Sequence, residues 1–271
     1  MNMSSGDERP IGVFDSGLGG LTIAAALLRE LPQENLVYLG DTARVPYGGK
    51  SVKSLLEFAR QDAQFLLNKK VKLIVAACNT VSAVALPALQ EICGTIPFLG
   101  VIESGVNAAI GSGAGSILVT GTRTTVGSGK YAELIRKKKP EIRVDSIACP
   151  LLVPLAEEGI TSGTIAEQVL DLYFSPFRAD PPDAVLLGCT HYPLFRTAIE
   201  EYFSGRSNVI DSGSACAAAV KRILGEQSLA APADQTGTLS CYVTDYPAGF
   251  HLLAERFLGK KIPNVSPVIL E

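Results

Sequence analysis

Two short apolar segments of the chain each end in a cysteine that is followed by small hydrogen-bonding residues. The segments are Lys72-Leu-Ile-Val-Ala-Ala-Cys78-Asn79-Thr80 and Asp183-Ala-Val-Leu-Leu-Gly-Cys189-Thr190-His191. Residues with helical spacing follow each segment, so we expect both thiols to lie where a buried strand gives way to the N-terminus of a helix. This location favours a reactive thiol.

A thiol needs stabilisation to ionise near neutral pH. Its reference pKa of about 8.5 means that holding the thiolate at pH 7 costs about 2 kcal/mol. The free N–H groups and the positive dipole end of a helix N-terminus offset that cost. A single cysteine at the end of a strand is nevertheless more often a core residue than a nucleophile. It is the occurrence of two such cysteines in matching contexts that favours a catalytic pair.

The two cysteine segments belong to two similar halves of the chain. The first expected strands of the halves contain Ile11 and Ile117, which lie 106 positions apart, and Cys78 and Cys189 lie 111 positions apart. This agreement predicts two copies of one unit, and pseudo-twofold packing would bring both thiols into one cleft from opposite sides. A base on one face of a carbon and an acid on the other can move a proton between the faces. The residues after each cysteine offer donors for a substrate carboxylate.

Apolar runs alternate with segments of helical spacing along the whole chain, which predicts the α/β class. The expected strands cover residues 11–14, 36–39, 71–77, 97–101, 116–120, 142–148, 184–188, 208–210 and 239–244, with a last strand near Val265. The expected helices cover residues 22–31, 51–68, 79–92, 126–138, 151–158, 165–174, 194–203, 214–224 and 247–258.

Two loops at strand ends are rich in glycine. The first, Asp15-Ser16-Gly17-Leu18-Gly19-Gly20, partly fits the GxGxxG pattern of dinucleotide-binding proteins. However, Thr22 stands at the third glycine position, and Asp15 would repel a pyrophosphate. We therefore favour glycines that form a tight turn beside a ligand over a nicotinamide site. The second loop, residues 41–50, is long enough to be a binding loop.

The composition argues against several classes of protein. The 271 residues are 47% hydrophobic, which suits a large aliphatic core in one or two domains, and the net charge of −3 gives no nucleic-acid footprint. No apolar run of about eighteen residues predicts a membrane span. Residues 1–10 are polar and lack the apolar core of a secretory signal, so we expect a cytoplasmic protein. Six scattered cysteines without a CxxC pair, and only two histidines, fit neither a disulfide scaffold nor a zinc site.

Four motifs along the chain resemble those of glutamate racemases, within the aspartate/glutamate racemase superfamily. They are Asp15-Ser16-Gly-Leu-Gly-Gly, Asp41-Thr-Ala-Arg-Val-Pro46-Tyr47-Gly48, Ala-Cys78-Asn79-Thr80 and Gly-Cys189-Thr190-His191-Tyr-Pro. The resemblance extends from about Ile11 to at least Phe203. The cysteine motifs are shared across the superfamily, whereas the other two are more particular to glutamate racemases.

The resemblance implies an isomerase that interconverts L- and D-glutamate by a two-base mechanism, with no cofactor and no metal. Its product would supply D-glutamate for bacterial peptidoglycan, and thus for cell wall biogenesis and cell shape. Glutamate would be its small-molecule partner, with no nucleic acid and no membrane involved, and a homodimer is one assembly that the resemblance allows. Because little chain precedes Ile11, we expect no N-terminal extension of the kind that binds a cell-wall precursor activator in some relatives.

By analogy with the family, Cys78 and Cys189 are the two acid/base residues, and Asp15 assists Cys78. His191 would assist Cys189 together with Glu157, for which the adjacent glutamate at position 158 is the alternative. The implied substrate contacts are Asp15, Ser16, Pro46, Tyr47, Gly48, Asn79, Thr80, Thr122, Thr125, Thr190 and His191.

The resemblance also implies two pseudo-symmetric, three-layer α/β domains with mostly parallel sheets and an active site in the cleft between them. Residues 1–100 and 208–271 would form the first domain, and residues 101–207 the second. Three other functions stay open. An aspartate racemase or another superfamily member is the nearest, because one methylene in a pocket changes discrimination by only about 1–3 kcal/mol. The others are a catalytically silent ligand-binding relative and a nicotinamide-dependent reductase.

Overall fold

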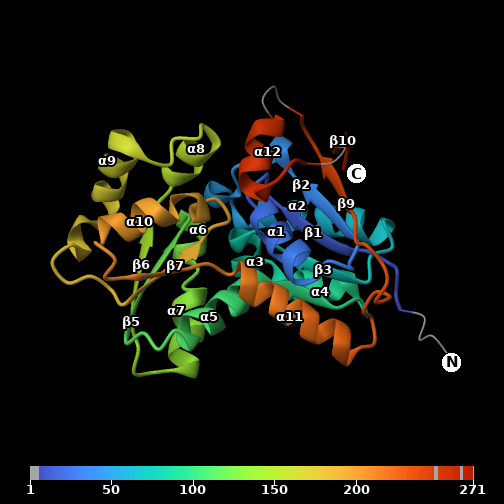
Figure 1. Ribbon diagram of the computed structural model, residues 1–271, viewed down its shortest axis with the longest axis horizontal. Helices are drawn as coiled ribbons and strands as arrows, with labels where there is room; N and C mark the ends of the chain where they lie inside the picture. Colours follow the sequence, from blue (N-terminus) through green and yellow to red (C-terminus); the bar gives the residue numbers. More distant parts are fainter. Residues whose placement is uncertain (1–5, 247–249, 263–264, 271) are drawn as a thin grey trace.

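Two separate parallel β-sheets form the framework of the protein (Figure 1). The computed structural model describes residues 6–246, 250–262 and 265–270. The first sheet has the strand order β10-β9-β2-β1-β3-β4, and all its neighbouring strands are parallel. Its strands are β1 (Ile11–Asp15), β2 (Leu36–Gly40), β3 (Leu73–Ala76), β4 (Phe98–Gly100), β9 (Leu239–Val243) and β10 (Val265–Pro267).

The second sheet repeats the order of the inner strands of the first. Its order is β6-β5-β7-β8, again with parallel neighbours, and it matches β2-β1-β3-β4 strand for strand. The strands are β5 (Ser116–Gly121), β6 (Arg143–Ala148), β7 (Ala184–Gly188) and β8 (Asn208–Ile210). The repeated order confirms the predicted α/β class with mostly parallel sheets and agrees with two copies of one unit.

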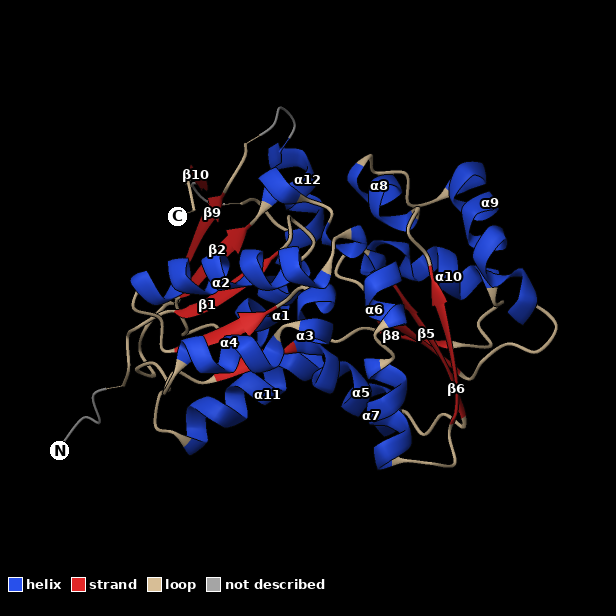
Figure 2. Ribbon diagram, turned by 180° about the vertical axis from the view of Figure 1, so that it is seen from behind, coloured by secondary structure: helices blue, strands red, loops and turns tan. Residues whose placement is uncertain are grey.

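Helices cover both faces of each sheet, as parallel sheets require (Figures 1 and 2). In the first half, α1 packs against α11 and α12, whereas α2 packs against α3 and α4. The helices of this half are α1 (Leu21–Glu30), α2 (Val52–Asn68), α3 (Asn79–Val84), α4 (Leu86–Cys93), α11 (Gly213–Glu226) and α12 (Phe250–Leu258). Those drawn around the second sheet are α5 (Val101–Gly111), α6 (Arg123–Gly127), α7 (Lys130–Lys138), α8 (Leu152–Glu157), α9 (Gly163–Phe174) and α10 (Arg196–Tyr202). Short 3-10 turns are η1 (Thr42–Arg44), η2 (Tyr47–Gly49), η3 (Ser175–Phe177) and η4 (Tyr192–Phe195).

The side chains of β1 show how the central strands hold two helical layers. Successive side chains of a strand point to opposite faces of the sheet. Ile11 and Val13 belong to the core that includes α1 and α11, and Phe14 belongs to the core on the α2 side. All five residues of β1 are buried, so the strand is fixed from both sides and its C-terminal end is a rigid support for a site.

The predicted boundaries need three corrections. The strand predicted at 208–210 was assigned to the first domain. It is β8 of the second sheet and pairs with β7, because its position there is equivalent to that of β4 in the first sheet. After β8 the chain returns to the first half, where α11 packs against α1. The rest of the division into two domains stays a prediction. The helix expected over 79–92 is broken at Ala85, and that over 126–138 is broken at Gly129, whose φ is +66°. The start of the helix predicted from residue 247 lies outside the described residues, and α12 is described from Phe250.

No helix among the described residues is both long and apolar enough to span a membrane.

Candidate active site

The two motif cysteines occupy equivalent positions in the two halves. Cys78 follows β3 and is the N-cap residue of α3, and Cys189 follows β7, just before η4. Since β3 and β7 are matching strands in the repeated order, the fold places both thiols at corresponding strand ends. Both side chains are buried, and both line the same cavity.

This cavity gathers most of the predicted site residues from both halves. Its volume is about 20 Å³, the space of about one water molecule, so its walls must separate to admit a larger ligand. Apolar side chains of Val45 and Val153, which were not among the expected substrate contacts, complete the lining. The predicted residues that line it are Ser16, Pro46, Tyr47, Gly48, Cys78, Asn79, Thr80, Thr122, Cys189, Thr190 and His191.

Three predicted residues stand directly behind this lining. Asp15 is fully buried at the end of β1, and Thr125 Oγ1 lies 3.3 Å from Thr80 Oγ1. Glu157 contacts His191 from the end of α8. These three residues therefore contact residues of the cavity lining but do not line the cavity themselves.

Asp15 contacts both the glycine loop and the second half of the chain. Its Oδ2 accepts a hydrogen bond from the Gly17 N–H at 3.1 Å, and its Oδ1 accepts one from Thr190 Oγ1 at 3.4 Å. Burial raises the pKa of Asp15, while the positive charge of His191 and the Gly20 N–H act in the opposite direction. The carboxyl group thus lies where it can influence both cysteine motifs.

The glycine loop is built for close approach of the two halves. A Cβ at Gly19 would lie 2.4 Å from Thr190 Oγ1 and 2.6 Å from His191 Nδ1, and one at Gly20 would lie 2.4 Å from the Cβ of Asp15. Real side chains do not tolerate such distances, so any other residue would push the loop and the Cys189 motif apart. This supports glycines that serve a tight turn beside a ligand.

His191 connects Cys189 with a carboxylate. Its Nδ1 lies 4.0 Å from Cys189 Sγ, and its Nε2 lies 3.2 Å from Glu157 Oε1. Burial lowers the pKa of His191, but its hydrogen bonds to Cys189 and Glu157 outweigh that effect and raise the pKa to about 10. His191 is therefore a cation at neutral pH, and its positive charge lies beside the Cys189 sulfur. The partner of its Nε2 is Glu157, whereas Glu158 is exposed.

At Cys78 burial outweighs the effect of the helix N-terminus on the pKa of the thiol. Burial raises the pKa of the Cys78 thiol to about 12, with the negative charge of Asp15 adding to it, although the Val81 N–H and Ser16 act in the opposite direction. Desolvation therefore outweighs the short helix α3. Cys78 therefore rests as a neutral thiol, which has a proton to give.

Three threonine hydroxyl groups meet between the halves. Thr80 Oγ1 lies 3.0 Å from Thr122 Oγ1, which lies 3.0 Å from Thr125 Oγ1. Thr122 also caps α6 by accepting from the Thr125 N–H at 3.2 Å. Each hydroxyl has one hydrogen and can redirect it, so the cluster can donate to a carboxylate that displaces these mutual contacts.

Tyr131 is a site residue that the sequence motifs did not reveal. Its buried hydroxyl donates to Asn79 Oδ1 at 2.6 Å. Since the amide oxygen is engaged, the Nδ2 group is the end of Asn79 that can donate to a ligand. A tyrosine in the first turn of α7 carries no motif signal, and only the contact of its hydroxyl with Asn79 in the first half shows its role.

We expect Tyr131→Phe to lower kcat/KM about tenfold, the effect of losing one hydrogen bond to a buried amide. Asn79 would then lack the partner that fixes its orientation. Steady-state circular dichroism assays measure the change. Tyr202→Phe, which removes a hydroxyl that donates to Asp171 away from the cavity, is the matched control. A Tyr131→Phe enzyme as active as that control would contradict this role.

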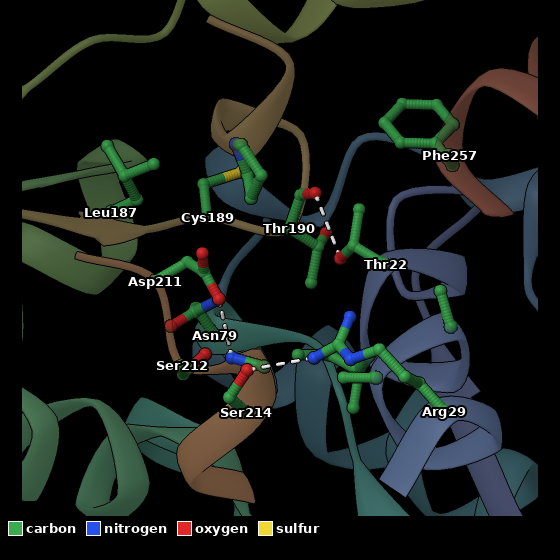
Figure 3. A pocket seen from close by; sticks show the side chains of 15 residues that line it. Thr22, Arg29, Asn79, Leu187, Cys189, Thr190, Asp211, Ser212, Ser214 and Phe257 are labelled. Carbon is green, nitrogen blue, oxygen red and sulfur yellow. Dashed lines mark hydrogen bonds between the residues drawn. The ribbon is translucent and has the colours of Figure 1, made fainter. Parts of the chain in front are cut away.

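A second cavity adjoins the first behind Cys189 (Figure 3). Its volume is about 190 Å³, and Asn79, Cys189 and Thr190 line both cavities. On its far side Arg29, which is largely exposed, donates from Nη2 to Ser214 Oγ at 2.9 Å. The space is large enough for water.

No group of three or more His, Cys, Asp or Glu side chains that could hold a metal ion occurs in the described part of the chain. The groups that surround the cavity and can take part in chemistry are thiols, carboxyls, an imidazole and hydroxyls.

The duplicated α/β fold is that of a racemase. A family model described as Asp/Glu/Hydantoin racemase matches residues 26–220. The chain belongs to the glutamate racemase family, whose members are isomerases.

Similar proteins cover the whole chain. It is 43% identical to a glutamate racemase of Syntrophus aciditrophicus over 100% of both chains. It is 44% identical to one of Geobacter metallireducens over 97% of both chains. Among solved structures, glutamate racemase from Francisella tularensis in complex with D-glutamate superposes with a TM-score of 0.91 at 40% identity, covering 98% of this chain and 99% of that one.

Proposed function

We propose that this protein interconverts L- and D-glutamate without a cofactor, by proton transfer between Cys78 and Cys189. The observation that carries the proposal is the position of the two thiols. They follow matching strands of the two halves and line one cavity. A thiol on each side of a bound amino acid can remove the α-proton from one face and supply a proton to the other.

The reaction is balanced within the cysteine pair. For one enantiomer, the Cys189 thiolate takes the α-proton, the Cα–H bond breaks, and its electron pair passes into the α-carboxylate. Cys78 then gives its S–H proton to the opposite face of Cα. The protein is left with a thiol at Cys189 and a thiolate at Cys78, and the reverse direction uses these roles exchanged.

The surrounding groups match these two protonation states. The His191 cation, held by Glu157, stabilises the thiolate at Cys189, and Asp15 lies where it can hold or exchange a proton on the Cys78 side. Hydroxyl groups of the threonine cluster can donate to a carboxylate whose charge increases as the α-proton leaves.

Circular dichroism of the purified protein with L-glutamate, and in parallel with L-aspartate, tests the proposal. We expect decay of the glutamate signal to zero with no added cofactor, and much slower change with aspartate. Faster turnover of aspartate would assign the aspartate racemase alternative. Saturable glutamate binding without any change of handedness would identify a binding relative instead.

We further propose that the D-glutamate made by this protein supplies peptidoglycan synthesis in the cytoplasm. Membership of the glutamate racemase family supports this role. Growth of a D-glutamate auxotroph carrying the gene, without added D-glutamate, is the expected result; continued dependence on D-glutamate would contradict it.

The measured mass in solution decides between a monomer and the homodimer that the family resemblance allows.

A further inference from the structure

Two buried carboxyl groups lie beneath the loop that carries Tyr47. Asp41, after β2, and Asp62, in the middle of α2, are both fully buried, and so is the side chain of Tyr47. Tyr47 Oη forms a short hydrogen bond with Asp41 Oδ2 and lies 3.1 Å from Asp62 Oδ2. One hydroxyl group thus contacts two acidic side chains.

Both contacts of the Tyr47 hydroxyl can be hydrogen bonds only if one of the two carboxyl groups is neutral. A tyrosine hydroxyl has one hydrogen and can donate to only one of the two oxygens. The other contact is a hydrogen bond only if that carboxyl is protonated and donates to Tyr47 Oη. Two carboxylates around one hydroxyl would also leave like charges close together in a buried site.

Asp41 has the partners of an anion. Arg44 Nε donates to its Oδ2 in a close ion pair, and Thr244 Oγ1 donates to its Oδ1 at 2.8 Å. Asp62 has weaker support. Its Oδ1 lies 3.6 Å from Arg44 Nη2, and neither atom has a hydrogen-bond partner among the described residues. The proton therefore belongs on Asp62.

We propose that Asp62 is a neutral carboxylic acid in the folded protein, and that its O–H donates to Tyr47 and positions the loop that lines the substrate cavity. Asp62 is a positioning residue, since it acts through Tyr47. Its effect on turnover rests on the proposed racemase function. Burial raises the pKa of Asp62 well above its ordinary value; the charges of Asp41 and Asp15 add to this rise, and the Arg44 guanidinium opposes it.

The loop links this buried acid to the cavity. Pro46, Tyr47 and Gly48 all line the cavity that contains the two cysteines. Thr124 Oγ1, from the second half, donates to the Gly48 carbonyl at 3.1 Å, and a Cβ at Gly48 would lie 2.5 Å from the Cβ of Thr122. A displacement of Tyr47 would therefore be passed to both walls of the cleft.

Two substitutions separate the neutral acid from an ion-pair partner. In Asp62→Asn the amide can donate to Tyr47 as the acid does, so we expect KM for glutamate within about twofold of the unsubstituted protein. In Asp62→Leu no donor remains, and we expect KM to rise about tenfold with a smaller change in kcat. Glu57→Gln, an exposed carboxylate on the same helix, is the matched control. Equal KM values for the Asn and Leu variants would overturn the positioning role.

The pH dependence of unfolding tests the protonation state without any activity. Where pH lies between the ordinary carboxyl pKa and the raised value, the folded protein holds one more proton at Asp62 than the unfolded chain does. Its stability therefore falls as pH rises, and asparagine removes this loss. We expect the unfolding constant of the unsubstituted protein, relative to Asp62→Asn, to increase with pH from 5 to 8 by up to about tenfold per unit.

An ionised Asp62 paired with Arg44 gives the opposite result. Asp62→Asn would then be less stable than the unsubstituted protein at pH 7, and the difference would shrink as pH falls. That outcome would overturn the proposal. Because unfolding is measured apart from turnover, a protein without racemase activity would contradict the proposed function and leave this test of Asp62 in force. If Asp62→Leu does not fold, Asp62→Asn alone still decides the protonation state.

Discussion

Replacing either Cys78 or Cys189 by alanine lowers racemase activity by at least about 10³-fold, because each thiol is the only acid/base group proposed for its face of the substrate. General acid–base groups typically contribute about 10²–10⁴-fold. In a two-base mechanism both are needed in every turnover, whichever enantiomer is supplied. Circular dichroism with each enantiomer of glutamate measures the loss.

Cys93→Ala is the matched control for these substitutions. Cys93 is as buried as Cys78 but lies at the end of α4 and does not line the cavity. Its replacement should leave activity within a few-fold of the unsubstituted protein. A Cys78 or Cys189 variant that racemises glutamate at the unsubstituted rate would eliminate the two-thiol assignment.

His191→Asn is expected to lower kcat/KM about 10²-fold. Without the imidazolium, the thiolate at Cys189 loses the cation that stabilises it in a buried site. Because the two enantiomers of glutamate have equal free energies, the ratio of the two kcat/KM values must stay at one. The loss in kcat/KM is therefore the same from L- and from D-glutamate, whereas kcat and KM can each change unequally. Steady-state kinetics in both directions check this.

Substitutions of the two adjacent glutamates test the route by which His191 is held. Glu157→Gln removes the negative charge 3.2 Å from His191 Nε2, so we expect a loss of about tenfold that becomes smaller when His191 is already asparagine. Glu158→Gln is the matched control and should have little effect, since that side chain is exposed. The reverse order of the two losses would assign the role to Glu158.

The sequence predicted the features that repeat or that interrupt a pattern. Two cysteines at matching strand ends, separated by nearly the spacing of the two halves, were sufficient to predict a duplicated α/β unit. The structure confirms this through the equal strand orders around β1 and β5. Loops rich in glycine or proline were also recognisable in the sequence. The structure explains two of their glycines, because a side chain at Gly19 or Gly48 would not fit against the opposite half.

The features that were not predicted depend on contacts between distant segments. Tyr131 and Asp62 lie within ordinary amphipathic helices, and their roles arise only when Asn79 and Tyr47 pack against them. The pKa of Cys78 could not be predicted from its local sequence for the same reason. Its local helix N-terminus favours the thiolate, but burial by the complete fold has the larger effect.

The most direct test of the two-thiol mechanism is the isotope content of both enantiomers early in the reaction of L-glutamate in D2O. The samples are taken at low conversion, separated by chirality and measured by mass spectrometry. Since solvent deuterium exchanges onto the thiols and the acid stands on the opposite face from the base, D-glutamate should carry deuterium at Cα while the remaining L-glutamate keeps hydrogen. D-glutamate that retains the original hydrogen, or deuterium appearing equally in both enantiomers from the start, would show that a single base serves both faces and would contradict the account.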